Sequence, residues 1–131
     1  MEQRNLMEAH VQAKRIYNLL NEVLDVSRQM ADALDRNDQV SVQVLLSMRQ
    51  EPINSLEEAN LALKQQCMDL PSVQDRTRLS ELLHGAEAND QSEMPLVDQI
   101  ASNKRLFKQV IDLDRVLSSK LSRGKSIYST N

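Results

Sequence analysis

The sequence predicts an all-α fold, in which a long antiparallel helical hairpin is followed by additional helices in a bundle or coiled-coil-like arrangement. The 131-residue chain has only two glycines and three prolines. Aromatic residues make up 2%, while Leu, Val, Gln, Glu and Arg are abundant, which favours helix over sheet. Apolar residues recur at helical spacing over long segments. We expect one helical domain over residues 1–121 and a flexible polar tail over residues 122–131.

The first helix is predicted from about Asn5 to Leu34. One apolar row repeats every seven residues and consists of Ala9, Ile16, Val23 and Met30. Leu20 and Leu34 each follow a member of this row by four residues, which makes one continuous seam. The polar segment Asp35–Asp38 then ends the helix. A link this short usually joins antiparallel neighbours, so these residues predict the tip of a hairpin.

The second helix is predicted from about Gln39 to Met68. Its first apolar row consists of Leu46, Ile53, Asn60 and Cys67. Its second consists of Leu56, Leu63 and Leu70, with Val42 and Leu45 leading into it. Pro52 lies inside this segment, where proline removes a backbone donor and clashes with the preceding turn. The residues allow two interpretations, namely one helix with a kink near Pro52 or two helices with Pro52 in the first turn of the second.

Two further helices are predicted. A shorter one begins after Ser72, which forms a capping pair with Asp75, and ends near His84 at Gly85. After a loop at about residues 86–91, Ser92 is the expected cap of the last helix. Pro95 is expected in the first turn of that helix, which should end over residues 122–124.

The last helix has the widest apolar face in the chain. Between Met94 and Leu121 the apolar residues cover an arc of roughly 200°, whereas a helix against one bundle face needs about 100°. The surplus predicts a surface for another helix, either of a partner or of a second copy of the chain. The candidate partner-binding residues are Leu106, Val110, Leu113, Leu117, Ile127 and Tyr128.

Charge and buried polarity add two open questions. The net charge is −3, which gives no general attraction for nucleic acid. Residues 96–131 are nevertheless locally basic, so they form either a solvated face or a docking surface for acidic helices.

Three polar residues lie on otherwise apolar faces, namely Asn60, Asn103 and Asp114. They lie either at the edge of the core or inside it, as buried groups that fix the register of the helices. A buried Asp114 would need a basic partner, for which Arg28 and Arg49 are candidates.

The sequence gives little support for a catalytic or metal-binding motif. Glu81 and His84 have the spacing of a di-iron ligand pair, but no second such pair exists in the sequence. Neither histidine is followed by the lysine and glycine typical of phosphotransfer domains, and Gly124–Ser126 lacks the earlier glycine of a phosphate-binding loop. We therefore expect no enzyme activity, no cofactor and no metal.

The location of the chain is predicted from what the sequence lacks. The first residues have no apolar run of a signal peptide, and no stretch is long enough to insert into a membrane. Cys67 is the only cysteine, so no disulfide framework or thiolate metal site is possible within one chain. We expect a cytoplasmic protein.

Three stretches resemble the flagellar type III export chaperones of the FlgN and FliT group. They are Met30–Asp38 at the end of the first helix, the leucine-rich Val44–Ile53 with its Arg-Glu pair, and Asn103–Leu106, which is similar to the Asn-x-x-Leu start of the group's late helix. The resemblance implies a cytoplasmic chaperone that binds the helical C-terminal segment of a hook-filament junction or cap protein and keeps it soluble for secretion. The alternative is a self-associating helical adaptor with no export role.

Overall fold

The protein is all-α, as the sequence predicts. The computed structural model describes the backbone of residues 1–129 and the side chains of residues 1–123. Its helices, in chain order, are α1 (Gln3–Asp35), α2 (Gln39–Met68), α3 (Val73–Leu83) and α4 (Met94–Ser129), with a 3-10 turn at Gln91–Glu93 before α4. No strand occurs among residues 1–129.

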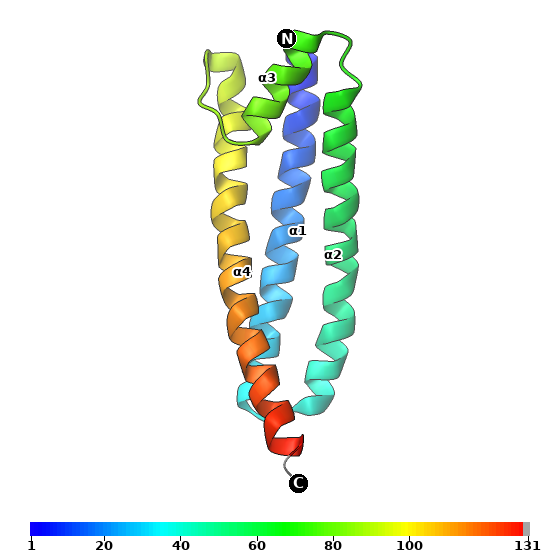
Figure 1. The fold of residues 1–131 in the computed structure, drawn as a ribbon, viewed down its shortest axis with the longest axis vertical. Coiled ribbons are helices and arrows are strands. Elements are labelled where there is room, and N and C mark those ends of the chain that lie inside the picture. The colour runs from blue at the N-terminus through cyan, green and yellow to red at the C-terminus, as the bar shows by residue number, and fades with distance from the viewer. Residues whose placement is uncertain (130–131) are drawn as a thin grey trace.

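The long helix α1 is the centre of the molecule (Figure 1). Over the described residues α2 and α4 each pack along α1 rather than closely against one another. The hairpin makes α2 antiparallel to α1, whereas α4 runs in the same direction as α1. The short helix α3 crosses near the N-terminal end of α1 and contacts both α2 and α4.

The hairpin tip lies where the sequence predicts it. Asn37 has a φ of +57°, in the left-handed region that asparagine tolerates better than most residues. Asp38 then caps α2, because its side chain accepts a hydrogen bond from the Ser41 amide at 3.1 Å. Backbone reversal and cap therefore both fall inside the predicted polar link.

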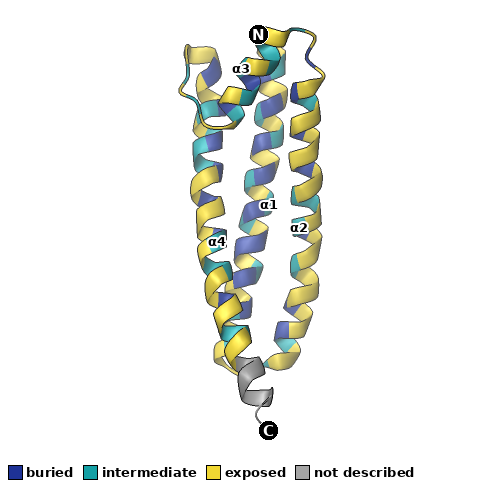
Figure 2. Cartoon of the chain, viewed as in Figure 1, coloured by how far each residue is buried: buried dark blue, intermediate teal, exposed yellow. Residues whose placement is uncertain are grey.

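Buried residues follow one another along α1 (Figure 2). The core they belong to forms two clusters. The predicted row of α1 is confirmed, since Ala9, Ile16, Val23 and Met30 are all buried. The first cluster joins α1 to all the other helices in the half of the molecule that contains α3. The second lies toward the hairpin tip and consists of Met30, Ala33, Val42, Leu45 and Leu117.

One of the two predicted rows of α2 is only half correct, since Cys67 is buried and Ile53 packs against the core. Leu46 is 41% exposed and Asn60 is exposed, whereas Pro52 and Ala59 are buried. Small or ring-closed side chains at positions 52 and 59 give α1 room to approach, and a pattern based on large apolar residues passes over them. The other row is confirmed in its buried members, Leu63 and Leu70.

Pro52 lies within one continuous helix, so the interpretation of two separate helices is wrong. The proline is buried. Ser72 caps α3 by accepting a hydrogen bond from the Asp75 amide at 3.3 Å, as predicted. Gly85 ends α3 with a φ of +101°, a conformation that side-chain-bearing residues rarely adopt.

The start of α4 differs from the sequence-based prediction in one detail. The predicted cap, Ser92, is itself capped: Asp90 accepts hydrogen bonds from the amide and hydroxyl of Ser92, at 2.9 and 2.5 Å. Pro95 lies in the first turn of α4, as expected. The helix continues to Ser129, past the end predicted at residues 122–124. The flexibility predicted for residues 122–131 stays a prediction, and residues 130–131 lie outside the described part of the chain.

Candidate helix-binding groove

The apolar stripe of α4 is used largely inside the molecule. Leu106, Val110 and Leu117 are only 6%, 5% and 4% exposed and belong to the core clusters. Leu113 is partly buried and touches both clusters. The arc is wide because α4 packs on α1 along one side while other side chains of the stripe point toward α2 and α3. The side chains of Ile127 and Tyr128 lie outside those described.

The apolar surface that α4 leaves free is smaller than the sequence indicates. Phe107 is 54% exposed and Val116 is 46% exposed, and they are the two exposed large apolar residues of the described part of α4 beyond its first residue. Phe107 borders a groove, whereas Val116 does not. Phe107, which the candidate set omitted, is therefore the residue of the stripe best placed to meet a partner.

The groove is an open cleft of about 320 Å³ lined by residues of all four helices. Its lining residues are Ile16, Leu20, Leu56, Asn60, Leu63, Leu83, Ile100, Asn103, Lys104 and Phe107. The apolar members come from α1, α2, α3 and α4, and the polar members are two amides and one ammonium group. An apolar floor with few polar groups suits the apolar face of an amphipathic helix.

The two asparagines of the groove behave differently. Asn60 is exposed and lies at the groove's edge, which confirms the edge-of-core interpretation for this residue. Asn103 is 9% exposed, and its Nδ2 donates a hydrogen bond to the Ala13 carbonyl oxygen at 2.8 Å. Its Oδ1 accepts a hydrogen bond from Gln99 Nε2 at 3.1 Å. The buried amide is therefore satisfied, and it fixes α4 against α1 beside the groove.

Lys104 connects the groove to the end of α3. Its Nζ donates a hydrogen bond to the His84 carbonyl oxygen at 2.8 Å, where a cation interacts favourably with the C-terminal end of a helix. A Cβ added to Gly85 would lie 2.2 Å from that Nζ. The glycine therefore permits both the left-handed turn and the close approach of the lysine.

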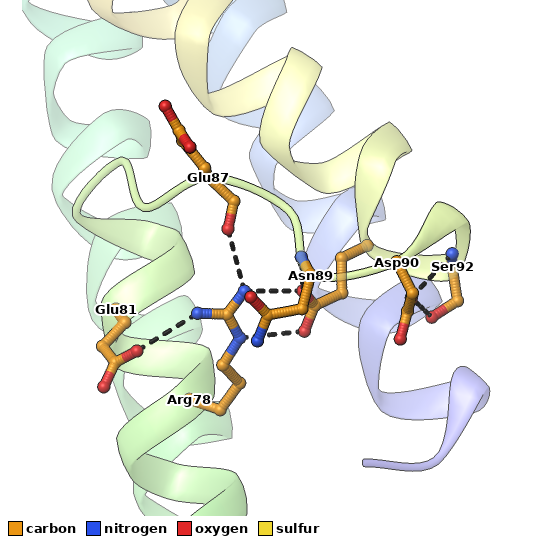
Figure 3. Close-up of polar contacts among 7 residues, drawn as sticks. Arg78, Glu81, Glu87, Asn89, Asp90 and Ser92 are labelled. Carbon is orange, nitrogen blue, oxygen red and sulfur yellow. Dashed lines mark hydrogen bonds and ion pairs between the residues drawn. The ribbon is translucent and has the colours of Figure 1, made fainter.

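An ion-pair network holds the loop between α3 and α4 (Figure 3). The Arg78 guanidinium on α3 forms a two-point contact with Glu93, with Nε–Oε2 and Nη2–Oε1 distances of 3.0 and 2.6 Å. The same guanidinium contacts Glu81 Oε2 at 3.1 Å and the Glu87 carbonyl at 2.9 Å. Glu93 Oε1 also accepts a hydrogen bond from the Asn89 amide at 2.8 Å. The network anchors α3, and with it Leu83, at one end of the groove.

The same contacts shift proton affinities. The hydrogen bonds from Arg78 lower the pKa of Glu93 below its ordinary value, and the Asn89 amide adds to this effect. Glu93 in turn raises the pKa of Arg78 further above its already high value. Sequence reasoning missed this pair because its members are fifteen positions apart, on different elements, with no local motif to connect them.

Asp114 has the partner that the sequence required. Arg49 on α2 forms an ion pair with Asp114 on α4, so Arg49 rather than Arg28 is the partner. Arg49 Nε also donates a hydrogen bond to Ser27 Oγ at 3.0 Å, and that hydroxyl donates to the Val23 carbonyl at 2.6 Å. This chain of contacts bridges α2 and α4 across α1, on the hairpin-tip side of the groove.

The two residues with the spacing of a metal-ligand pair, Glu81 and His84, make other contacts in the structure. Glu81 pairs with Arg78, and His84 Nδ1 lies 2.6 Å from the Ser80 carbonyl oxygen. Among the described residues, no three histidine, cysteine or acidic side chains are grouped so that they could hold a metal ion. The Cys67 thiol is buried, which raises its pKa, and it donates a hydrogen bond to the Arg76 carbonyl oxygen.

No helix in the described part of the chain combines the length and the apolar character needed to cross a membrane.

Comparisons with known proteins give no match: no family model, no curated protein and no solved structure is significantly similar to this chain.

Proposed function

We propose that the protein binds an amphipathic helix of a client in the groove between α2 and α4, and that it acts as a cytoplasmic flagellar export chaperone. The client is the helical C-terminal segment of a hook-filament junction or cap protein, which the chaperone keeps soluble before type III secretion. The observation that carries the proposal is the groove itself, an apolar cleft open to a helix and bordered by the exposed Phe107.

The groove provides a physical basis for recognition. A helix that presents apolar residues at positions i, i+3 or i+4, and i+7 would place them over the leucines and isoleucines of the floor. Each well-buried aliphatic side chain contributes roughly 1.5–3 kcal/mol, whereas association costs at least about 4 kcal/mol. Three or four anchors therefore give reversible binding, which suits a protein that must release its client.

The resemblance supports the choice of client. One of the three similar stretches, Asn103–Leu106, lies beside the groove, where Asn103 and Lys104 are lining residues. The other two, Met30–Asp38 and Val44–Ile53, form the hairpin tip and the adjoining half of α2. The similar residues therefore include part of the proposed binding site and part of the scaffold that holds it.

The proposal is tested by calorimetric titration of the full chain with the C-terminal segment of the hook-filament junction or cap protein encoded in the same genome. Phe107→Asp should weaken binding at least about tenfold, because a carboxylate then borders the apolar floor. Val116→Asp is the matched control, since it makes the same type of change on the same helix at a similarly exposed position outside the groove. Equal losses for both variants, or no binding to either segment, would rule out the proposed site.

The same groove could bind a helix of a second copy, as the adaptor alternative requires. Light scattering after size exclusion separates the two functions. A chaperone ready for its client remains a monomer across a concentration series, whereas an adaptor forms a stable oligomer without a client. An oligomer that Phe107→Asp dissociates would favour the adaptor.

A further inference from the structure

The hairpin has a second cleft system, on the side of the α1–α2 contact away from the groove. Three clefts of about 970, 390 and 340 Å³ follow one another between α1 and α2, from the end near α3 to the hairpin tip. We call them together the hairpin furrow. No residue lines both the furrow and the groove. At about 100° per residue, Glu51 in the furrow and Leu56 in the groove point in directions roughly 140° apart around α2.

The hairpin furrow is strongly acidic. Eight carboxylates line it, against two guanidinium groups, those of Arg4 and Arg36. Among the described residues Glu22, Asp32 and Glu51 have no ion-pair partner, and Arg36 lies 3.9 Å from Asp38, outside the furrow. Glu8, Asp25 and Asp75 form ion pairs, whereas the three unpaired carboxylates repel one another along the hairpin.

Exposed apolar side chains lie among these carboxylates. Val40, Val44 and Met48 are spaced four residues apart on α2, are 77%, 54% and 52% exposed, and line the two clefts nearest the tip. Val11 on α1 is 67% exposed and lines the third cleft. An exposed apolar row beside the carboxylates of α1 and Glu51 of α2 is the complement of a helix with an apolar stripe flanked by basic residues.

We propose that the hairpin furrow binds a basic amphipathic helix of a partner protein, at a site separate from the groove and independent of the function proposed for it. The partner's apolar stripe contacts Val40, Val44 and Met48, and its Lys and Arg side chains pair with Glu22, Asp32 and Glu51. The hairpin is long enough for such a helix, since α2 alone extends about 45 Å at 1.5 Å per residue.

A second copy fits this surface less well. Two furrows placed face to face would bring acidic residues together. The basic outer face of α4 carries Arg105, Lys108 and Arg115, but the one large apolar residue exposed among them is Val116. Nucleic acid would be repelled by the same carboxylates. A partner helix that brings its own apolar stripe satisfies both the charge and the apolar row.

The test is fluorescence anisotropy with a labelled synthetic helix of about 20 residues, with leucine along one stripe and lysine along both flanks. The full chain should bind this peptide and should not bind the same peptide with glutamate in place of lysine. The double variant Glu22→Lys with Glu51→Lys should weaken binding at least about tenfold. The double variant Glu57→Lys with Asp112→Lys has the same net charge and alters exposed residues outside the furrow, so its effect should be smaller than about threefold.

Three results would overturn the proposal. Equal losses in both double variants would indicate general attraction rather than a site. Peptide-induced amide shifts centred on Phe107 instead of Val44 and Met48 would place the peptide in the groove. Formation of dimers that the furrow variant dissociates would make a second copy the occupant. The variant Phe107→Asp should retain full affinity for the lysine peptide, so that failure at the furrow is distinguishable from failure at the groove.

Discussion

A substitution at Leu117 tests whether the apolar stripe of α4 belongs to the protein's core or forms a binding surface. Its side chain is 4% exposed and packs in the cluster near the hairpin tip, with Val42 and Leu45 from α2. Replacing a buried leucine by alanine removes its contacts and leaves a cavity, which costs about 3 kcal/mol within an observed range of roughly 2–5. Leu117→Ala should therefore destabilise the fold rather than act on binding alone.

The expected shift in melting temperature follows from chain length. With an unfolding entropy of about 2.1 cal/mol/K per residue, 131 residues give roughly 0.28 kcal/mol/K. A loss of about 3 kcal/mol then lowers Tm by about 10 °C. Phe107→Ala is the comparison, because a side chain that is 54% exposed should cost about 1 kcal/mol or less, a shift of about 4 °C at most.

Thermal unfolding followed by circular dichroism measures both variants. A Leu117→Ala protein that melts within about 2 °C of the wild type while losing client affinity would refute the reasoning. That result would mean that Leu117 is a partner contact and that the last helix does not pack as described. A large loss of stability for Leu117→Ala, with normal affinity in the folded protein, supports its place in the core.

Three further predictions concern the polar contacts. Glu93→Gln removes the charge that holds Arg78, so hydrogen exchange should accelerate in α3 and not in the middle of α1; unchanged protection of α3 would contradict this role. Glu93 and Asp38 have lowered pKa values in the folded state, so their contributions are present above the ordinary carboxyl pKa and lost as pH falls through the lowered values. Melting temperature should thus fall below about pH 4, and less steeply in Glu93→Gln. Arg49→Met removes the guanidinium hydrogen bonds to Asp114 and Ser27, a loss of about 1.5 kcal/mol that should lower Tm by about 5 °C, whereas an unchanged Tm would show that the bridge is dispensable.

Helical periodicity was sufficient for most of the fold. The bounds of α2 match the prediction at both ends, since Asp38 caps its start and the chain turns before Pro71. The row on α1 was also correct because large apolar residues occupy it at regular intervals. The row on α2 failed where Pro52 and Ala59 form the contact. Small residues carry little hydrophobic signal, although they allow the closest approach of two helices.

The candidate site was harder to predict for a related reason. A wide apolar arc indicates that more than one side of α4 is buried. It does not show whether the residues that bury it belong to the same chain or to a partner. Leu106, Val110 and Leu117 turned out to face the protein's own core, and Phe107 at the edge of the arc lines the groove. Contacts between elements, such as Arg78 with Glu93 and Asn103 with Ala13, depend on the packing of α3 and α4. No spacing along the chain encodes them.

The proposed function depends most directly on whether a client helix enters the groove. The decisive measurement is a methyl NMR titration of the Ile- and Leu-labelled full chain with the C-terminal segment of the hook-filament junction or cap protein. The account predicts shifts concentrated on Ile16, Leu56, Leu63 and Ile100, with Leu45 and Leu117 near the hairpin tip unaffected. Shifts confined to the region of Leu117, or no shifts at saturating client, would contradict it.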